Sequence, residues 1–71
     1  MKKEVYEKMN LLMLNYGAEL DKMLVMVKET CTAEEFEKYR KATGKIMGVM
    51  LLDIMNPIYA EFPELKPVEL E

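Results

Sequence analysis

One carboxylate stands alone in the most apolar stretch of the 71-residue sequence, and it is the first candidate for chemistry. Asp53 is the only charged residue between Val49 and Met55. A carboxylate in apolar surroundings must find a partner or be neutralised. With Asn56 three residues further on, it suggests a polar pocket for a small ligand. The competing interpretation is a surface carboxylate, or a salt bridge that sets the register of the helices.

Basic residues gather in the middle of the chain, at Lys38, Arg40, Lys41 and Lys45. The three lysines have i, i+3, i+7 spacing, which places them in a stripe on a helix, and such a stripe suits a phosphate backbone. Glu34 and Glu37 precede Lys38 and Lys41 by four residues, the favourable order for ion pairs along a helix. Two interpretations follow: a nucleic-acid-binding regulator, or a solvated, salt-bridged surface. The net charge of −3 favours the second.

The residue types lack the usual constellations for catalysis and metal binding. The sequence contains no histidine and a single cysteine, Cys31. Zinc sites and di-metal helix bundles draw on histidine or on several cysteines, and a thiol without a neighbouring base is a poor nucleophile. Phosphate-cradling glycine loops and nucleophile elbows are also missing. We therefore expect no catalytic, cofactor-binding or metal-binding residues, and a protein that is not an enzyme.

A heptad stripe organises the first half of the chain. Its members advance by alternating steps of three and four residues, and they are Tyr6, Met9, Met13, Tyr16, Leu20, Met23, Val27 and Thr30. This spacing predicts a helix over about residues 3–30. Because Val5, Leu12 and Met26 widen the apolar surface beyond one seam, we expect this helix to touch two or more neighbours.

A turn and a helix restart follow directly. Thr32 and Glu35 have the spacing of a capping box, and Cys31 and Phe36 occupy the positions of a hydrophobic staple. These signals predict a turn at residues 31–32 and a second helix over about 33–55. A turn this short makes the two helices antiparallel neighbours, with residue n beside roughly residue 62 − n.

All three glycines fall in one layer of this predicted hairpin. Gly17 lies opposite the stretch from Gly44 to Gly48. Since glycine in a helix interior costs about 1 kcal/mol relative to alanine, the cluster predicts a close crossing of the two backbones. The alternative is that the glycines are tolerated without a packing role.

Prolines shape the end of the chain. Pro57 lacks an N–H and crowds the carbonyl four residues back. The second helix therefore either kinks over residues 56–62 or restarts there with Asn56 as its cap. Pro63 and Pro67 then predict an extended arm over residues 63–71, which we expect to lie over a partner.

Length and composition point to self-association. A single core in a chain this short supplies only roughly 3–5 kcal/mol, yet 51% of the 71 residues are apolar. Eight methionines add adaptable apolar surface. We expect one all-α domain over residues 1–71: an antiparallel two-helix hairpin that dimerises into a four-helix bundle, with a proline-containing extended C-terminal arm.

The expected role is that of a small homo-oligomeric interaction or regulatory protein, with another protein as a further candidate partner. The most apolar run, from Ile46 to Met55, is shorter than the roughly 20 residues that span a bilayer. The N-terminal residues do not read as a secretory signal, so we expect a cytoplasmic location.

Overall fold

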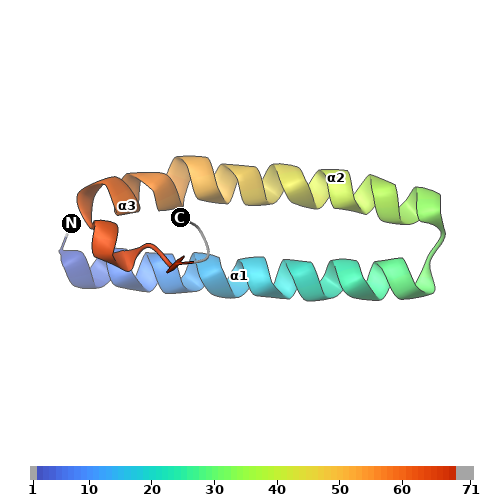
Figure 1. The fold of residues 1–71 in the computed structure, drawn as a ribbon, viewed down its shortest axis with the longest axis horizontal. Coiled ribbons are helices and arrows are strands. Elements are labelled where there is room, and N and C mark those ends of the chain that lie inside the picture. Colours follow the sequence, from blue (N-terminus) through green and yellow to red (C-terminus); the bar gives the residue numbers. More distant parts are fainter. Residues whose placement is uncertain (1, 69–71) are drawn as a thin grey trace.

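Two long antiparallel helices make up most of the structure (Figure 1). The computed structural model describes residues 2–68, so residues 69–71 of the predicted arm lie outside the described part. Helix α1 spans Lys3–Thr30 and helix α2 spans Ala33–Val49. The chain is all-helical over the described residues and measures 45 × 20 × 16 Å. It is therefore little more than one helix thick, since a helix with its side chains is about 10–12 Å across.

The turn between the helices is held by a capping box. The Glu35 amide donates to Thr32 Oγ1 at 3.1 Å, and the Thr32 amide donates to Glu35 Oε1 at 3.0 Å. These two bonds satisfy backbone donors that the first turn of α2 leaves free. The hydrogen bond from the Thr32 backbone holds the pKa of the Glu35 carboxyl below its ordinary value. Helix α2 consequently begins at Ala33.

The pairing register changes along the hairpin. Near the turn, Lys28 Nζ lies 6.0 Å from the centre of the Phe36 ring, so the two residue numbers sum to 64 rather than 62. At the open end, where the chain begins and α3 lies, the Tyr6 and Phe62 rings are 5.3 Å apart, and their numbers sum to 68. The π-helical segment of the second arm contributes to this slip, because each of its hydrogen-bonded turns takes up one residue more than a turn of α-helix.

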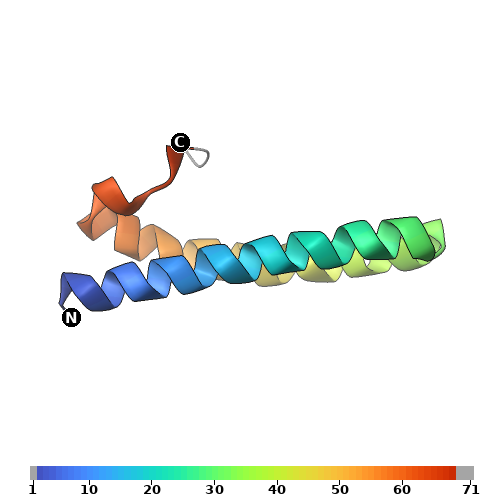
Figure 2. The same cartoon turned by 90° about the horizontal axis from the view of Figure 1, so that it is seen from below.

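That segment, η1, spans Met50–Met55 and precedes Pro57. The Asn56 N–H donates to the Leu51 carbonyl, five residues back, which is the π-helical pattern. Met55 and Asn56 both keep right-handed helical angles, so Asn56 does not cap a new helix. Helix α3 continues over Asn56–Glu61 and turns away from the line of α2 (Figure 2). Of the two outcomes expected at Pro57, the structure has the kink.

The core sits at the open end of the hairpin. Met55, Ile58 and Tyr59 are the buried apolar residues of the described chain. Partly buried side chains from α1, η1 and the C-terminal segment pack against them. The bend at η1 thus folds α3 over the start of α1 and covers the apolar cluster at this end.

The segment after α3 differs from the expected extended arm. Residues Pro63–Leu65 form a 3-10 turn, η2, before Lys66 becomes extended. Leu65 packs against the core of its own chain. The proline at the start of η2 is compatible with such a turn, because the first residues of a helical turn need no N–H donor.

Candidate functional site

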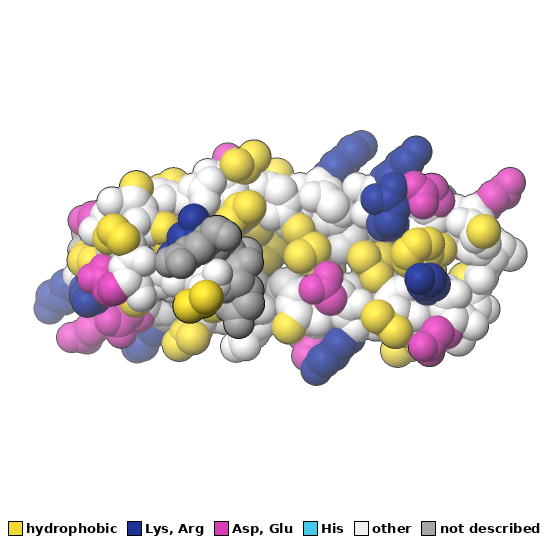
Figure 3. Space-filling model, viewed as in Figure 1, with side chains coloured by type: hydrophobic (Ala, Val, Ile, Leu, Met, Phe, Trp, Pro, Cys, Tyr) yellow, Lys and Arg dark blue, Asp and Glu magenta, His cyan; other side chains and the backbone are white. Residues whose placement is uncertain are grey.

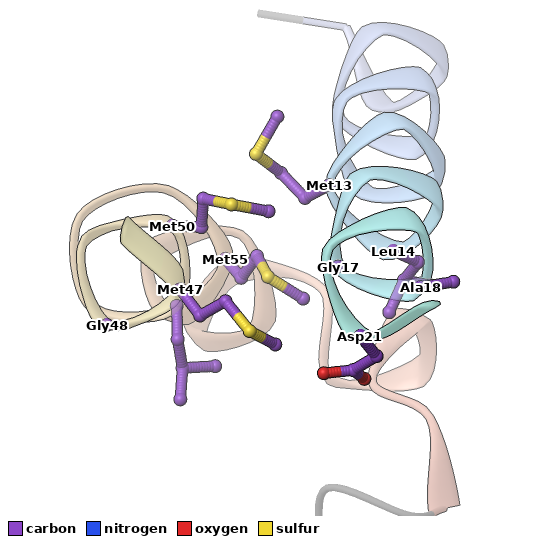
Figure 4. Close-up of a pocket in the computed structure, with 10 residues that line it drawn as sticks. Met13, Leu14, Gly17, Ala18, Asp21, Met47, Gly48, Met50 and Met55 are labelled. Atoms are coloured by element: carbon purple, nitrogen blue, oxygen red, sulfur yellow. The ribbon is translucent and has the colours of Figure 1, made fainter. Parts of the chain in front are cut away.

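A groove lined by methionines runs between α1 and the segment formed by α2 and η1. Its volume is about 470 Å³. Met13 reaches into it from α1, and Met47, Met50 and Met55 reach toward α1 from the opposite wall (Figure 4). Figure 3 shows hydrophobic side chains gathered between the helices on this face, which also carries the C-terminal segment. Methionine side chains are flexible and polarizable, so such a groove can adapt to apolar groups of different shape.

One charged residue lines the methionine groove. Asp21 projects from α1 beside Ala18 and Leu14, and all three line the same groove (Figure 4). Asp21 is exposed, so its carboxylate keeps its contact with water. The groove is therefore apolar along its floor and carries a single negative group on its wall.

The glycines do not mark a close crossing of the two backbones. A Cβ placed on Gly17 would meet only the flexible tip of Met47, at 3.8 Å. A Cβ on Gly44 or on Gly48 would have no heavy atom within 4 Å apart from its own helix. The expected close approach within the hairpin is wrong, because methionine side chains separate the helices at this level. Gly17 and Gly48 instead leave the groove wide.

A second, shallower groove lies on the other side of the hairpin. It has a volume of about 370 Å³ and is lined by Tyr16, Glu19, Leu20, Met23, Ile46 and Met50. Tyr16 is two residues before Ala18, and Met23 is two residues after Asp21. Both Ala18 and Asp21 line the methionine groove. Residues two apart lie about 200° apart around a helix. The two grooves therefore open on opposite faces of the α1–α2 layer.

A buried polar contact ties the C-terminal segment to α1. The Tyr59 hydroxyl donates to Asn10 Oδ1, and Asn10 Nδ2 donates to the Leu65 carbonyl at 3.3 Å. Asn10 is 5% exposed and Tyr59 is 6% exposed. Burial raises the pKa of the Tyr59 hydroxyl. The side-chain amide of Asn10 thus links α1 to both α3 and η2.

The sequence interpretation missed the role of Asn10. Its signal was an amide among Met9, Leu11 and Leu12, where a polar side chain needs a partner if it is buried. The approximate register placed it near Asp53, whereas its partner is Tyr59. The error follows from the extra residues that η1 takes up.

Further contacts anchor the end of the chain to the first turns of α1. Lys3 Nζ lies 3.5 Å from Glu64 Oε2 and 5.6 Å from the centre of the Phe62 ring. A hydrogen bond to Glu61 raises the pKa of the Tyr6 hydroxyl. These contacts are exposed, so each contributes little alone. Together they hold the segment after α3 against its own chain.

The two residues of the suggested polar pocket lie on the surface. Asp53 and Asn56 are both exposed, and neither lines either groove. The π-helical segment carries Asp53 while directing Leu51 and Met55 toward the core. The structure therefore does not bring Asp53 and Asn56 into an enclosed site.

The basic residues are all exposed on α2. Arg40 pairs with Glu37, its Nε lying 3.1 Å from Glu37 Oε2. This hydrogen bond raises the pKa of Arg40 and lowers that of Glu37. Lys38 Nζ lies over the Tyr39 ring at 5.7 Å. Part of the positive charge of these basic residues is thus offset by Glu37 of the same helix.

Cys31 is exposed at the turn, with its Sγ 3.6 Å from Thr30 Oγ1. Phe36, its expected staple partner, is half-buried, and Lys28 lies over its ring. No basic or acidic side chain is paired with the thiol among the described contacts. Cys31 is therefore part of an exposed turn on the surface.

No protein-family model, curated protein or solved structure matches this chain. None of the helices within residues 2–68 combines the length and apolar character needed to cross a membrane. Nor do residues 2–68 bring three metal-ligating side chains of the His, Cys, Asp or Glu types together. The candidate site is therefore the apolar surface itself, divided between two grooves.

Proposed function

We propose that this protein is a small non-enzymatic interaction protein that works as a homodimer, with two hairpins packed as an antiparallel four-helix bundle. The supporting observation is its exposed area. A compact protein of 8.3 kDa exposes about 4,600 Å², whereas this chain exposes 5514 Å². The excess of about 900 Å² is close to the roughly 800 Å² that each partner buries in a standard interface.

The nature of the exposed surface supports the same proposal. Twelve large hydrophobic side chains of the described residues are exposed, against three apolar residues that are buried. Single exposed apolar residues are ordinary, but a large contiguous patch marks an interaction surface. A second hairpin covers such a surface with groups of the same kind, as in other helix bundles.

Sedimentation equilibrium tests the dimer. The expected mass at micromolar concentration is about twice 8.3 kDa. Circular dichroism on the same samples measures whether the chain is helical. A folded, helical monomer throughout this concentration range contradicts the proposal.

We assign the methionine groove to a partner protein, in the form of an apolar helical segment with one basic residue. Helices commonly insert apolar side chains into such grooves, and Asp21 supplies a complementary charge for a lysine or arginine. This assignment makes the dimer an interaction module with an outward-facing binding surface. Methionine allows that surface to accept related segments.

Differential affinity capture tests the partner surface. Ala18→Glu adds a second carboxylate on the groove wall, while Leu11→Glu adds one outside both grooves. A protein recovered with the wild type and Leu11→Glu but lost with Ala18→Glu supports the assignment. A protein recovered equally with all three chains binds elsewhere.

A further inference from the structure

The hairpin carries one apolar face that is suited to a second copy of the same chain. We infer that the dimer forms through this face, which we call the Tyr16–Ile46 face. It consists of exposed residues of both helices: Val5, Leu12, Tyr16, Met23, Tyr39 and Ile46. The inference rests on the proposed dimer and specifies which surface makes it.

The α1 part of this face is continuous along the helix. At 100° per residue, Val5, Leu12, Tyr16 and Met23 fall within an arc of about 40°. The remaining α1 residue in that arc is Thr30, so the arc contains no charge. A strip of this kind can be covered without leaving a charge buried and unpaired.

The α2 part lies on the same side of the hairpin. Tyr39 and Ile46 are seven residues apart and so share one side of α2, within about 20°. Ile46 lines the shallow groove together with Tyr16 and Met23. This shared groove shows that the two strips join across the gap between the helices. A side chain from a second copy can fill its roughly 370 Å³.

The described residues after α3, 62–68, leave this face open. They contact α1 through Lys3, Tyr6 and Asn10. These residues lie at least about 80° from the Val5 and Tyr16 strip around the helix. The segment therefore covers the opposite side, where the methionine groove also opens. Within residues 2–68 nothing obstructs a second copy on the Tyr16–Ile46 face, and the methionine groove then faces outward.

Area and composition select a second copy over other occupants. The excess exposed area is close to one side of a standard dimer interface, about 800 Å². A symmetric dimer places the same apolar strip on both partners. Glu19, which lines the shallow groove beside this strip, is exposed and pairs with Lys22 Nζ at 3.5 Å. Tyr16 and Tyr39 also belong to the residue type that commonly carries binding energy at interface centres.

Thiol protection tests the face without disrupting the dimer. Cys31→Ser first removes the native thiol. Ile46→Cys and Leu11→Cys are then made separately in that background, at positions that are 51% and 59% exposed in the single chain. Leu11 lies away from both grooves and serves as the matched control. The labelling rate with a neutral maleimide is measured from dilute to concentrated protein.

We expect the labelling rate of the Ile46→Cys variant to fall at least about tenfold as the dimer forms, while that of the Leu11→Cys variant changes little. In sedimentation, Ile46→Glu should raise the dissociation constant about a hundredfold or more, and Leu11→Glu should not. Equal labelling of both thiols in a dimeric sample overturns the assignment of the face but keeps the dimer. A monomeric wild type overturns the dimer and the face together.

Discussion

The contact between Asn10 and Tyr59 allows a sharp prediction about stability. Tyr59→Phe removes only the hydroxyl, and the ring still fills its place in the core. Asn10 Oδ1 then loses its donor in a residue that is 5% exposed. Leaving a buried acceptor without a partner costs about 1–3 kcal/mol. For a chain of this size, each kcal/mol lowers the melting temperature by about 4–8 °C.

Thermal denaturation followed by circular dichroism measures this effect. Protein concentration is held constant, because the proposed dimerisation would make the melting temperature depend on it. The control is Glu7→Gln, which changes one exposed side chain of α1 outside both grooves and outside the Tyr16–Ile46 face and should change stability by less than about 0.5 kcal/mol. Equal melting temperatures for the wild type and Tyr59→Phe would refute the proposed role of the contact.

The same residue predicts a dependence on alkaline pH. Burial raises the pKa of Tyr59 above the ordinary value of 10.0. The unfolded chain therefore loses this proton at lower pH than the folded chain, so stability present below pH 10 is lost as pH rises through the folded pKa. Tyr59→Phe should weaken this alkaline loss. If the wild type and Tyr59→Phe lose stability with the same slope above pH 10, the hydroxyl is not buried in its protonated form.

Three further changes test other parts of the fold. Gly44→Ala should raise stability by about 0.5–1 kcal/mol, since a Cβ there meets no atom within 4 Å; a lower melting temperature would reveal a contact that the single chain lacks. Thr32→Ala should cost about 1 kcal/mol in urea denaturation by removing the cap. Because the pKa of Glu35 is lowered in the folded chain, the stability that the cap contributes is present above pH 4.5 and is lost as pH falls through the folded pKa. If the wild type and Thr32→Ala lose stability in the same way as the pH falls, this linkage is wrong. Pro57→Ala restores an amide that can donate to the Asp53 carbonyl, so the bend should relax. Tyr59 then moves away from Asn10, and the melting temperature should fall. If the structure of Pro57→Ala keeps the π-helical turn, Pro57 is not the cause of the bend.

The sequence located the helices because their signals are local. Heptad spacing identified α1, and the Thr32 and Glu35 pair identified the start of α2. Both signals act over a few residues and depend little on the rest of the chain. The approximate antiparallel pairing also follows, since a two-residue connection leaves the second helix little choice of direction.

Other expectations failed where packing decides. The glycine cluster suggested touching backbones, but Met47 occupies the space beside Gly17. Tyr16 and Met23 belong to the heptad stripe, yet they are 53% and 43% exposed and lie beside the seam. A linear stripe does not specify how far a neighbouring helix rotates toward it, because several crossing arrangements satisfy the same spacing.

The open end of the hairpin shows most clearly what tertiary structure adds. The sequence by itself determined that Pro57 interrupts the second helix, because proline has no N–H to donate. It did not determine that η1 would widen into a π-helix, fold α3 over α1 and bring Tyr59 to Asn10. Those outcomes depend on contacts between residues far apart in the chain. Local chemistry therefore determined the helices, and long-range packing decided which apolar surface is covered and which remains open.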